Sequence, residues 1–182
     1  MTGFMAVFLD RDGIINRAIV RKGKPFPPAR LEEVEVLPGV LGSLQRLAAY
    51  GYILIGITNQ PDVARGLQSR EIVESINTWI QSRLPLRDIL VCYHDDSDAC
   101  DCRKPKPGLI LKAAQKYELD LSHSWMVGDR WKDIAAGQAV GLKTIFVDYH
   151  YSEKYNCAPP DIVIEDISLL ANIILKDQNE NT

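Results

Sequence analysis

Two aspartates at the end of a short apolar run are the residues of this chain best placed to do chemistry. Residues 4–9 are apolar, and Asp10, Arg11, Asp12 and Gly13 follow directly. Alternate residues of an extended segment point to the same side, so the carboxylates of Asp10 and Asp12 can converge, and a hard cation such as Mg²⁺ would relieve their repulsion. The same residues are about as typical of a plain Asp-Gly turn. A calcium-binding loop fits poorly, because its glycine belongs at the sixth position and follows a helix.

Cysteine and histidine side chains form a second group with a metal-binding spacing. They follow the pattern C-x-H-x5-C-x-C and are Cys92, His94, Cys100 and Cys102. Three thiolates and one imidazole complete a closed tetrahedral zinc site of the structural type. Because the group holds three of the 4 cysteines and one of the 3 histidines, incidental cysteines are the weaker explanation. The metal would stiffen the loop that continues into Arg103 and Lys104.

Short apolar runs that alternate with helical patterns must position these residues. Strands are predicted over residues 4–9, 52–57, 89–93, 125–127, 144–147 and 161–165, and helices after Pro38, Ser69 and Pro107 and over 131–140 and 167–175. This order predicts an α/β fold with a mostly parallel sheet covered on both faces. Residues 17–28 are predicted to be a basic, proline-rich loop, for which we favour an anion-binding flap over a solvated surface loop. We expect one domain over residues 1–175 and a frayed polar tail over 176–182.

The polar residues that follow these strands should meet at one edge of the sheet, because parallel α/β sheets bind ligands at the carboxyl ends of their strands. Thr58, Asn59 and Gln60 end the second predicted strand, and Gly128-Asp129-Arg130 end the fourth. A cation held by Asp10, Asp12 and Asp129 would need oxygens from a substrate, and phosphate supplies them. One carboxylate could then attack phosphorus while the other moves a proton, and Thr58 and Lys104 could stabilise the phosphoryl oxygens.

Composition and charge narrow the functional classes. The chain has 182 residues, 46% hydrophobic and 25% charged, with a net charge of −3 and a pI near 5.6. These values give no overall attraction to nucleic acid or to an anionic membrane, and no apolar run reaches membrane-spanning length. The N-terminus does not have the pattern of a signal peptide. We therefore expect a cytoplasmic protein with reduced thiols, a monomer whose partner is a small phosphorylated substrate.

Four motifs resemble those of the haloacid dehalogenase (HAD) phosphatase superfamily, and most closely its zinc-containing histidinol-phosphatase and heptose-bisphosphatase branch. They are Asp10-Arg11-Asp12-Gly13, Thr58-Asn59-Gln60, Arg103-Lys104-Pro105-Lys106-Pro107-Gly108 and Gly128-Asp129. The resemblance implies a Rossmann-like three-layer sandwich with a zinc-stabilised loop. It implies Asp10 as nucleophile, Asp12 as general acid and base, and Thr58 and Lys104 as groups that stabilise the phosphoryl oxygens.

The resemblance also implies the ligands of two metals and a set of substrate contacts. Magnesium would be held by Asp10, the backbone carbonyl of Asp12 and Asp129, with Asp133 just outside the ligands, and structural zinc by the four cysteine and histidine side chains. Contacts to a phosphorylated sugar are expected from Arg11, Asn59, Gln60, Arg103 and Arg130. The sequence departs from the branch at three places, namely Ile14, the dipeptide Pro61-Asp62 and Arg130, and Pro61-Asp62 bears on substrate preference.

Two activities compete within that branch. Removal of the 7-phosphate of D-glycero-D-manno-heptose 1,7-bisphosphate is favoured by Ala64-Arg65-Gly66 and by a length that leaves no room for a second enzyme domain. Hydrolysis of histidinol phosphate is favoured by the short spacing between His94 and Cys100. Two interpretations from other classes are a catalytically silent sugar-phosphate binder on the same fold and a zinc-dependent binding module.

The lengths of two inserts predict how open the site is. The segment between residues 13 and 38 and the cysteine loop are each too short to fold as a covering cap domain. We therefore expect no large cap domain and an open site. Its specificity would be set by the basic loop and the zinc loop.

Overall fold

A six-stranded sheet forms the centre of the computed structural model, which describes residues 3–180. Its strand order is β5-β4-β1-β6-β7-β8, and every neighbouring pair is parallel. The strands are β1 (Ala6–Leu9), β4 (Ile53–Asn59), β5 (Asp88–Cys92), β6 (Trp125–Gly128), β7 (Lys143–Val147) and β8 (Ile162–Ile164). This arrangement confirms the parallel α/β sheet predicted from the sequence.

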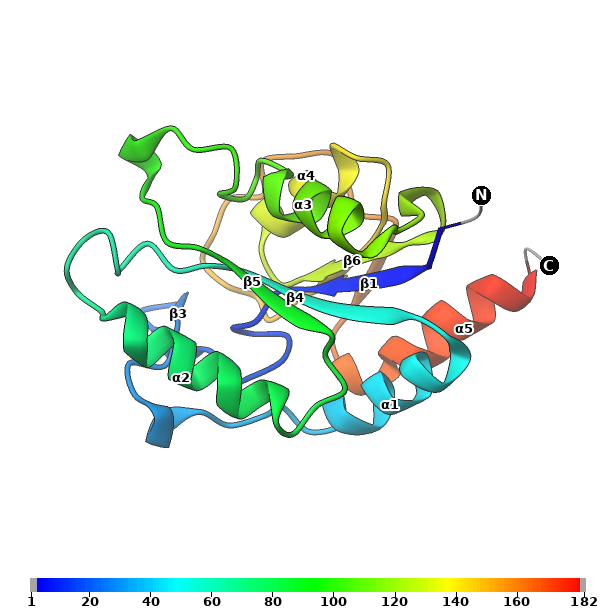
Figure 1. Cartoon of the computed structure of the whole chain (residues 1–182), viewed down its shortest axis with the longest axis horizontal. Helices are drawn as coiled ribbons and strands as arrows, with labels where there is room; N and C mark the ends of the chain where they lie inside the picture. The colour runs from blue at the N-terminus through cyan, green and yellow to red at the C-terminus, as the bar shows by residue number, and fades with distance from the viewer. Residues whose placement is uncertain (1–2, 181–182) are drawn as a thin grey trace.

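Helices cover both faces of the sheet and give the fold three layers (Figure 1). One face carries α1 (Val40–Tyr50), α2 (Arg70–Gln81) and α5 (Leu170–Glu180), and the other carries α3 (Gly108–Tyr117) and α4 (Trp131–Gln138). Between β1 and α1 the chain forms only a hairpin and a short 3-10 turn, and between β5 and α3 only a loop with one such turn. Neither insert forms a cap domain, as predicted.

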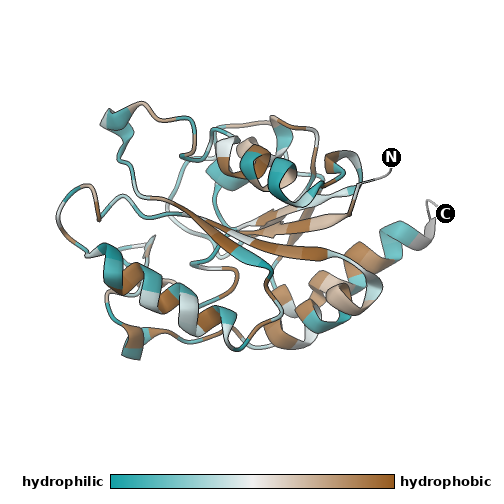
Figure 2. Cartoon of the chain, in the orientation of Figure 1, coloured by the Kyte–Doolittle hydropathy of each residue, from teal (hydrophilic) through white to brown (hydrophobic). Residues whose placement is uncertain are grey.

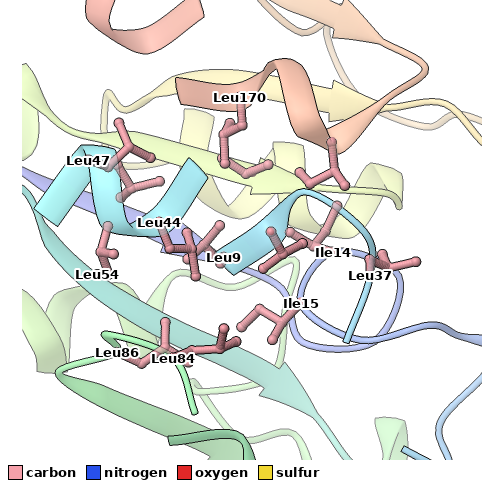
Figure 3. Packing of buried hydrophobic residues seen from close by; sticks show 14 of the residues in the cluster. Leu9, Ile14, Ile15, Leu37, Leu44, Leu47, Leu54, Leu84, Leu86 and Leu170 are labelled. Carbon is pink, nitrogen blue, oxygen red and sulfur yellow. The ribbon is translucent and has the colours of Figure 1, made fainter. Parts of the chain in front are cut away.

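Alternation along β1 explains why the sheet is buried on both sides. Val7 and Leu9 pack into a cluster under α1 and α5, whereas Ala6 and Phe8 pack into a second cluster under α3 and α4. Figure 3 shows the first cluster, with Leu9 beside Leu44, and Figure 2 shows apolar residues concentrated in the strands. Full burial of a valine, leucine or phenylalanine side chain, as at Val7, Leu9 and Phe8, stabilises the fold by about 1.5–3 kcal/mol relative to exposure. The central strand is therefore held rigidly where it ends.

The ends of two helices follow the signals expected from the sequence. Gly51 ends α1 with a φ of 107°, a left-handed conformation that glycine adopts without steric cost. Ser69 caps α2, because its hydroxyl accepts a hydrogen bond from the backbone N–H of Ile72 at 3.2 Å.

Strand register brings the polar motifs to one edge of the sheet. Leu9, the last residue of β1, pairs with Gly56 of β4 and with Val127 of β6. Because the three strands are parallel, the residues that follow them emerge on the same side. Asp10 continues the pairing, since its N–H donates to the carbonyl of Val127 at 3.0 Å.

The structure corrects two of the predicted elements. Within the predicted basic loop, β2 (Ile19–Arg21) and β3 (Lys24–Phe26) form an antiparallel hairpin, which tolerates Pro25 because a two-stranded ribbon leaves some N–H positions unpaired. The tail predicted to be frayed is instead helical, since α5 continues past residue 175 as far as Glu180. An ion pair of 2.6 Å between Lys143 and Asp177 ties this last part of the helix to β7. Residues 181–182 lie outside the described part of the chain.

Within residues 3–180 no helix combines the length and apolar character needed to cross a bilayer.

Candidate active site

Lys104 lies buried between two carboxylates at the carboxyl edge of the sheet. Its Nζ is 2.7 Å from Asp10 Oδ1 and 2.7 Å from Asp133 Oδ1, and it donates to the carbonyl of Ile57 at 2.9 Å. Burial by itself would lower the pKa of this amine, but the two carboxylates outweigh burial and raise it above the usual range. Lys104 is therefore a fixed positive charge beside Asp10.

Three buried carboxylates surround the end of β1. Oxygens of Asp10, Asp129 and Asp133 all lie within 4.8 Å of one another. Burial is the main cause that raises the pKa of Asp10 to about 7, helped by Asp133 and Asp12 and opposed by Lys104. Burial, followed by the charges of Asp10 and Asp133, also raises the pKa of Asp129 well above its usual range. The group holds more negative charge than the one ammonium can balance.

Asp129 provides the test of whether a divalent cation fits this group. Both of its carboxylate oxygens are buried and have no well-formed hydrogen bond to the described residues. Buried carboxylates normally have hydrogen-bond partners or hold a metal. Because Mg²⁺ prefers carboxylate and carbonyl oxygens, the residues present suit it.

Gly13 allows the aspartate loop to approach Asp129 closely. Its φ is +104°, and a Cβ at this position would lie 1.9 Å from Asp129 Oδ2. No side chain fits into that space without moving the carboxylate. The glycine of the motif is therefore required by both backbone conformation and contact.

The carboxylate of Asp12 is held by neighbours outside the acidic group. Its Oδ2 accepts hydrogen bonds from Gln60 Nε2 at 2.7 Å and from Arg11 Nη2 at 2.9 Å, and its Oδ1 accepts one from Asn16 Nδ2 at 3.0 Å. Gln60 Nε2 also donates to Thr58 Oγ1 at 2.9 Å. Asp12 thus borders the cavity with its side chain fixed, while its carboxylate stands apart from the group of Asp10.

Arg11 corrects the predicted set of substrate contacts. Its side chain is fully buried, and Nη1 donates to Asn77 Oδ1 of α2 at 2.8 Å. A guanidinium enclosed in this way cannot touch a substrate, so its assignment as a substrate contact was wrong. Sequence reasoning also missed Asn16 and Asn77. Asn77 could have been found, because it is a polar residue on the apolar face of an amphipathic helix.

An open cavity of about 70 Å³ lies over these groups. The predicted residues Thr58, Asn59 and Arg130 border it, whereas Gln60 and Arg103 do not. Its full lining is Asp10, Asp12, Pro25, Phe26, Pro27, Thr58, Asn59, Lys104, Arg130, Lys132 and Asp133. The hairpin and the residue after it therefore contribute two prolines and an aromatic ring to the wall.

Three of the predicted basic groups are held by acidic neighbours. Arg103 Nε contacts Asp96 Oδ1 at 2.7 Å and borders an adjacent cavity, and Arg17 of the predicted flap pairs with Glu35 at 3.0 Å on the surface. Arg130 borders the main cavity, but its Nε donates to Glu153 Oε2 at 3.0 Å.

The four predicted zinc ligands come together in the loop after β5. Their Sγ–Sγ distances are 3.1, 3.5 and 3.7 Å, and His94 Nδ1 lies 3.3 Å from Cys102 Sγ. The sulfurs are too far apart for a disulfide, whose length is about 2.05 Å. They are close to the separation of about 3.8 Å that tetrahedral zinc with bonds of about 2.3 Å requires. The donor set and its spacing therefore suit zinc.

Comparison with known proteins places this geometry in a family. A family model described as HAD-hydrolase-like matches residues 101–170. The D-glycero-beta-D-manno-heptose-1,7-bisphosphate 7-phosphatase of Helicobacter pylori is 38% identical over 144 residues, which cover 76% of this chain and 80% of that protein. The protein of the same name from Pasteurella multocida is 34% identical over 149 residues, covering 76% and 78%.

Solved structures agree with the sequence relatives. The D,D-heptose 1,7-bisphosphate phosphatase of B. bronchiseptica, complexed with magnesium and phosphate, superposes with a TM-score of 0.79 at 27% identity, covering 95% of this chain and 99% of that one. The corresponding phosphatase of Burkholderia thailandensis gives a TM-score of 0.64 at 25% identity, covering 94% and 98%. These findings confirm the resemblance carried by the four motifs. The chain belongs to the HAD-like phosphatases, in the group that includes the D-glycero-D-manno-heptose-1,7-bisphosphate 7-phosphatases.

Proposed function

We propose that this chain is a magnesium-dependent phosphatase that removes the 7-phosphate of D-glycero-D-manno-heptose 1,7-bisphosphate. The observation that carries the chemistry is the buried contact of 2.7 Å between Asp10 and Lys104, beside the buried carboxylate of Asp129. A nucleophile, a fixed cation and a set of oxygen ligands for a metal are the parts that phosphoryl transfer needs. The substrate is proposed from two sequence relatives and one structural neighbour, all of which are heptose bisphosphate phosphatases.

Asp10 is the proposed nucleophile. One of its oxygens attacks phosphorus while the bond between phosphorus and the sugar oxygen breaks, which gives an aspartyl-phosphate and a sugar alkoxide. Lys104 and the hydroxyl of Thr58 stabilise the charge on the transferring oxygens. Both groups are already in place, because Lys104 is fixed by Asp133 and Thr58 by Gln60.

Asp12 is the proposed general acid and base. In its protonated form it gives a proton to the leaving sugar oxygen, and as a carboxylate it then takes a proton from water. That water attacks phosphorus, releases inorganic phosphate and restores the Asp10 carboxylate. Gln60 and Asn16 hold the Asp12 side chain at the cavity wall, where it can reach both the leaving oxygen and the water.

Magnesium would be held by the carboxylates of Asp10 and Asp129 and by the backbone carbonyl of Asp12. When bound, it supplies positive charge to the acidic group and polarises a phosphoryl oxygen. Asp133 has a different proposed role, because its two oxygens already accept hydrogen bonds from Lys104 and from the N–H of Arg130. It orients the lysine.

We further propose that the cysteine and histidine cluster holds one structural zinc ion. Its loop leads directly into Lys104, and a closed tetrahedral site would limit the movement of that loop. Four cysteines without disulfides fit a reducing compartment, so we place the protein in the cytoplasm. We also propose that it is a monomer with a single domain. Light scattering on the purified chain measures the oligomeric state directly.

Phosphate release from heptose 1,7-bisphosphate tests the proposed activity. Asp10→Asn should fold with an unchanged circular dichroism spectrum and release no phosphate, because an amide is a poor nucleophile. Glu32→Gln, at an exposed position outside the cavity, is the matched control and should retain full activity.

Three outcomes would count against the proposal. Turnover by Asp10→Asn would overturn the nucleophile assignment. Binding of the bisphosphate by the unaltered chain without turnover would support a silent binder. Faster hydrolysis of histidinol phosphate, assayed side by side, would assign the alternative substrate.

A further inference from the structure

The cations that border the cavity differ in how their charge is compensated. Lys104 is fixed between Asp10 and Asp133, and the guanidinium of Arg130 is paired with Glu153. Lys132 also lines the cavity, yet it forms no ion pair with a described side chain of residues 3–178. Among the three cations of this lining, Lys132 is the one whose charged group is not bound directly by a carboxylate of a described side chain.

The charged neighbours of Lys132 are bound to other cations and form no direct ion pair with its ammonium. Its Nζ lies 5.7 Å from the ring centre of Trp131. Asp96, whose pKa the charge of Lys132 influences, is already bound by Arg103 at 2.7 Å, and the cavity carboxylates Asp10 and Asp133 are bound by Lys104. The hydrogen bond from Arg103 is the main cause of the lowered pKa of Asp96, and the charge of Lys132 lowers that pKa further.

The position of Lys132 at the start of α4 does not stabilise that helix, which favours a role for its charge in binding a ligand. It is the second residue of α4, where the partial positive charge of the helix end disfavours a cation. A bound anion next to a half-buried lysine at the start of a helix would offset the electrostatic repulsion between the ammonium and the helix end. Because Lys104 and the end of β1 occupy the reacting side of the same cavity, the anion would belong to the part of the substrate that does not react.

We propose that Lys132 binds the second phosphate of the substrate, the one that is not transferred. This assignment rests on the proposed function, since a sugar bisphosphate with one phosphate at Asp10 presents another anion farther along the molecule. It also separates the two candidate substrates. Histidinol phosphate carries an ammonium group away from its phosphate, and that group would be repelled by the charge of Lys132.

The test compares two substrates that differ only in the second phosphate. For heptose 1,7-bisphosphate and heptose 7-phosphate, the ratio of the two kcat/KM values measures recognition of the second phosphate. Lys132→Gln should lower that ratio about tenfold or more, mainly through a higher KM for the bisphosphate, because a charge-assisted contact is worth about 1.5–3 kcal/mol. Lys132→Glu should lower it further, and Lys132→Arg should restore most of it.

Lys112→Gln is the matched control, because Lys112 is an exposed lysine of α3 that does not line the cavity, and it should leave the ratio unchanged. An unchanged ratio in Lys132→Gln, or an equal loss with both substrates, would overturn the assignment. If the unaltered chain fails to hydrolyse the bisphosphate, the proposed function itself is wrong, and the assignment falls with it. The two failures are therefore distinguishable in one set of assays.

Discussion

The side chain of Asn59 binds the backbone of Lys104 through both of its polar atoms. Asn59 Nδ2 donates to the Lys104 carbonyl at 3.0 Å, and Asn59 Oδ1 accepts from the Lys104 N–H at 3.1 Å. These contacts join the end of β4 to a residue 45 positions away in sequence. The loop that carries the lysine is thereby fixed to the sheet edge from which Asp10 emerges.

Asn59→Ala should slow the chemical step more than it weakens the fold. Without the amide, the backbone of Lys104 loses two hydrogen bonds, each worth about 0.5–1.5 kcal/mol, and its ammonium is no longer positioned reliably. We expect kcat to fall about tenfold to a hundredfold, since small displacements of catalytic groups are costly. Steady-state kinetics and a thermal melt measure the two effects, and a fall in Tm with unchanged kcat would contradict this role.

Gly13→Ala should damage the acidic group. A Cβ would meet Asp129 Oδ2 at 1.9 Å, and the φ of +104° is strained for any L side chain. We expect a loss of activity together with a loss of stability of about 1–3 kcal/mol. Urea denaturation and magnesium titration by calorimetry measure both effects.

Gly42→Ala is the matched control for Gly13→Ala. Gly42 lies inside α1, and a methyl group added there would meet no atom within 4 Å apart from its own stretch of helix, so alanine is accommodated. It should stabilise the chain by about 0.5–1 kcal/mol, because alanine favours a helix over glycine. Equal effects of the two substitutions would contradict the steric explanation.

Cys100→Ser should abolish the proposed zinc site and loosen the loop before Lys104. Metal analysis of the unaltered chain should find about one equivalent of zinc, and the variant should hold much less, because the closed site needs all four ligands. We expect a lower Tm and reduced activity. Cys157→Ser is the control, since the Cys157 thiol contacts the carbonyl of Trp131 at 3.5 Å, away from the cluster, and it should retain the metal. An unaltered chain without zinc would remove the structural-metal proposal.

The sequence by itself determined the parts of this protein that depend on local pattern. Apolar runs of strand length predicted β1, β4 and β6, and parallel pairing then required Asp10, Thr58 and Asp129 to meet at one edge. The cysteine spacing likewise predicted a cluster that the structure brings together. These features were predictable because periodicity and loop length depend on neighbouring residues.

Only the tertiary structure decided where the polar side chains of the site point. Arg11 stands between two cavity residues in sequence, yet its guanidinium turns inward to Asn77 of α2, 66 positions away. Lys104 faces two carboxylates rather than one because α4 brings Asp133 beside Asp10, and the hairpin turns Phe26 toward the cavity. These directions depend on partners that meet only when the layers pack. A buried charged side chain takes the orientation in which its hydrogen bonds are satisfied. The residues that accept or donate those bonds cannot be identified from sequence spacing alone.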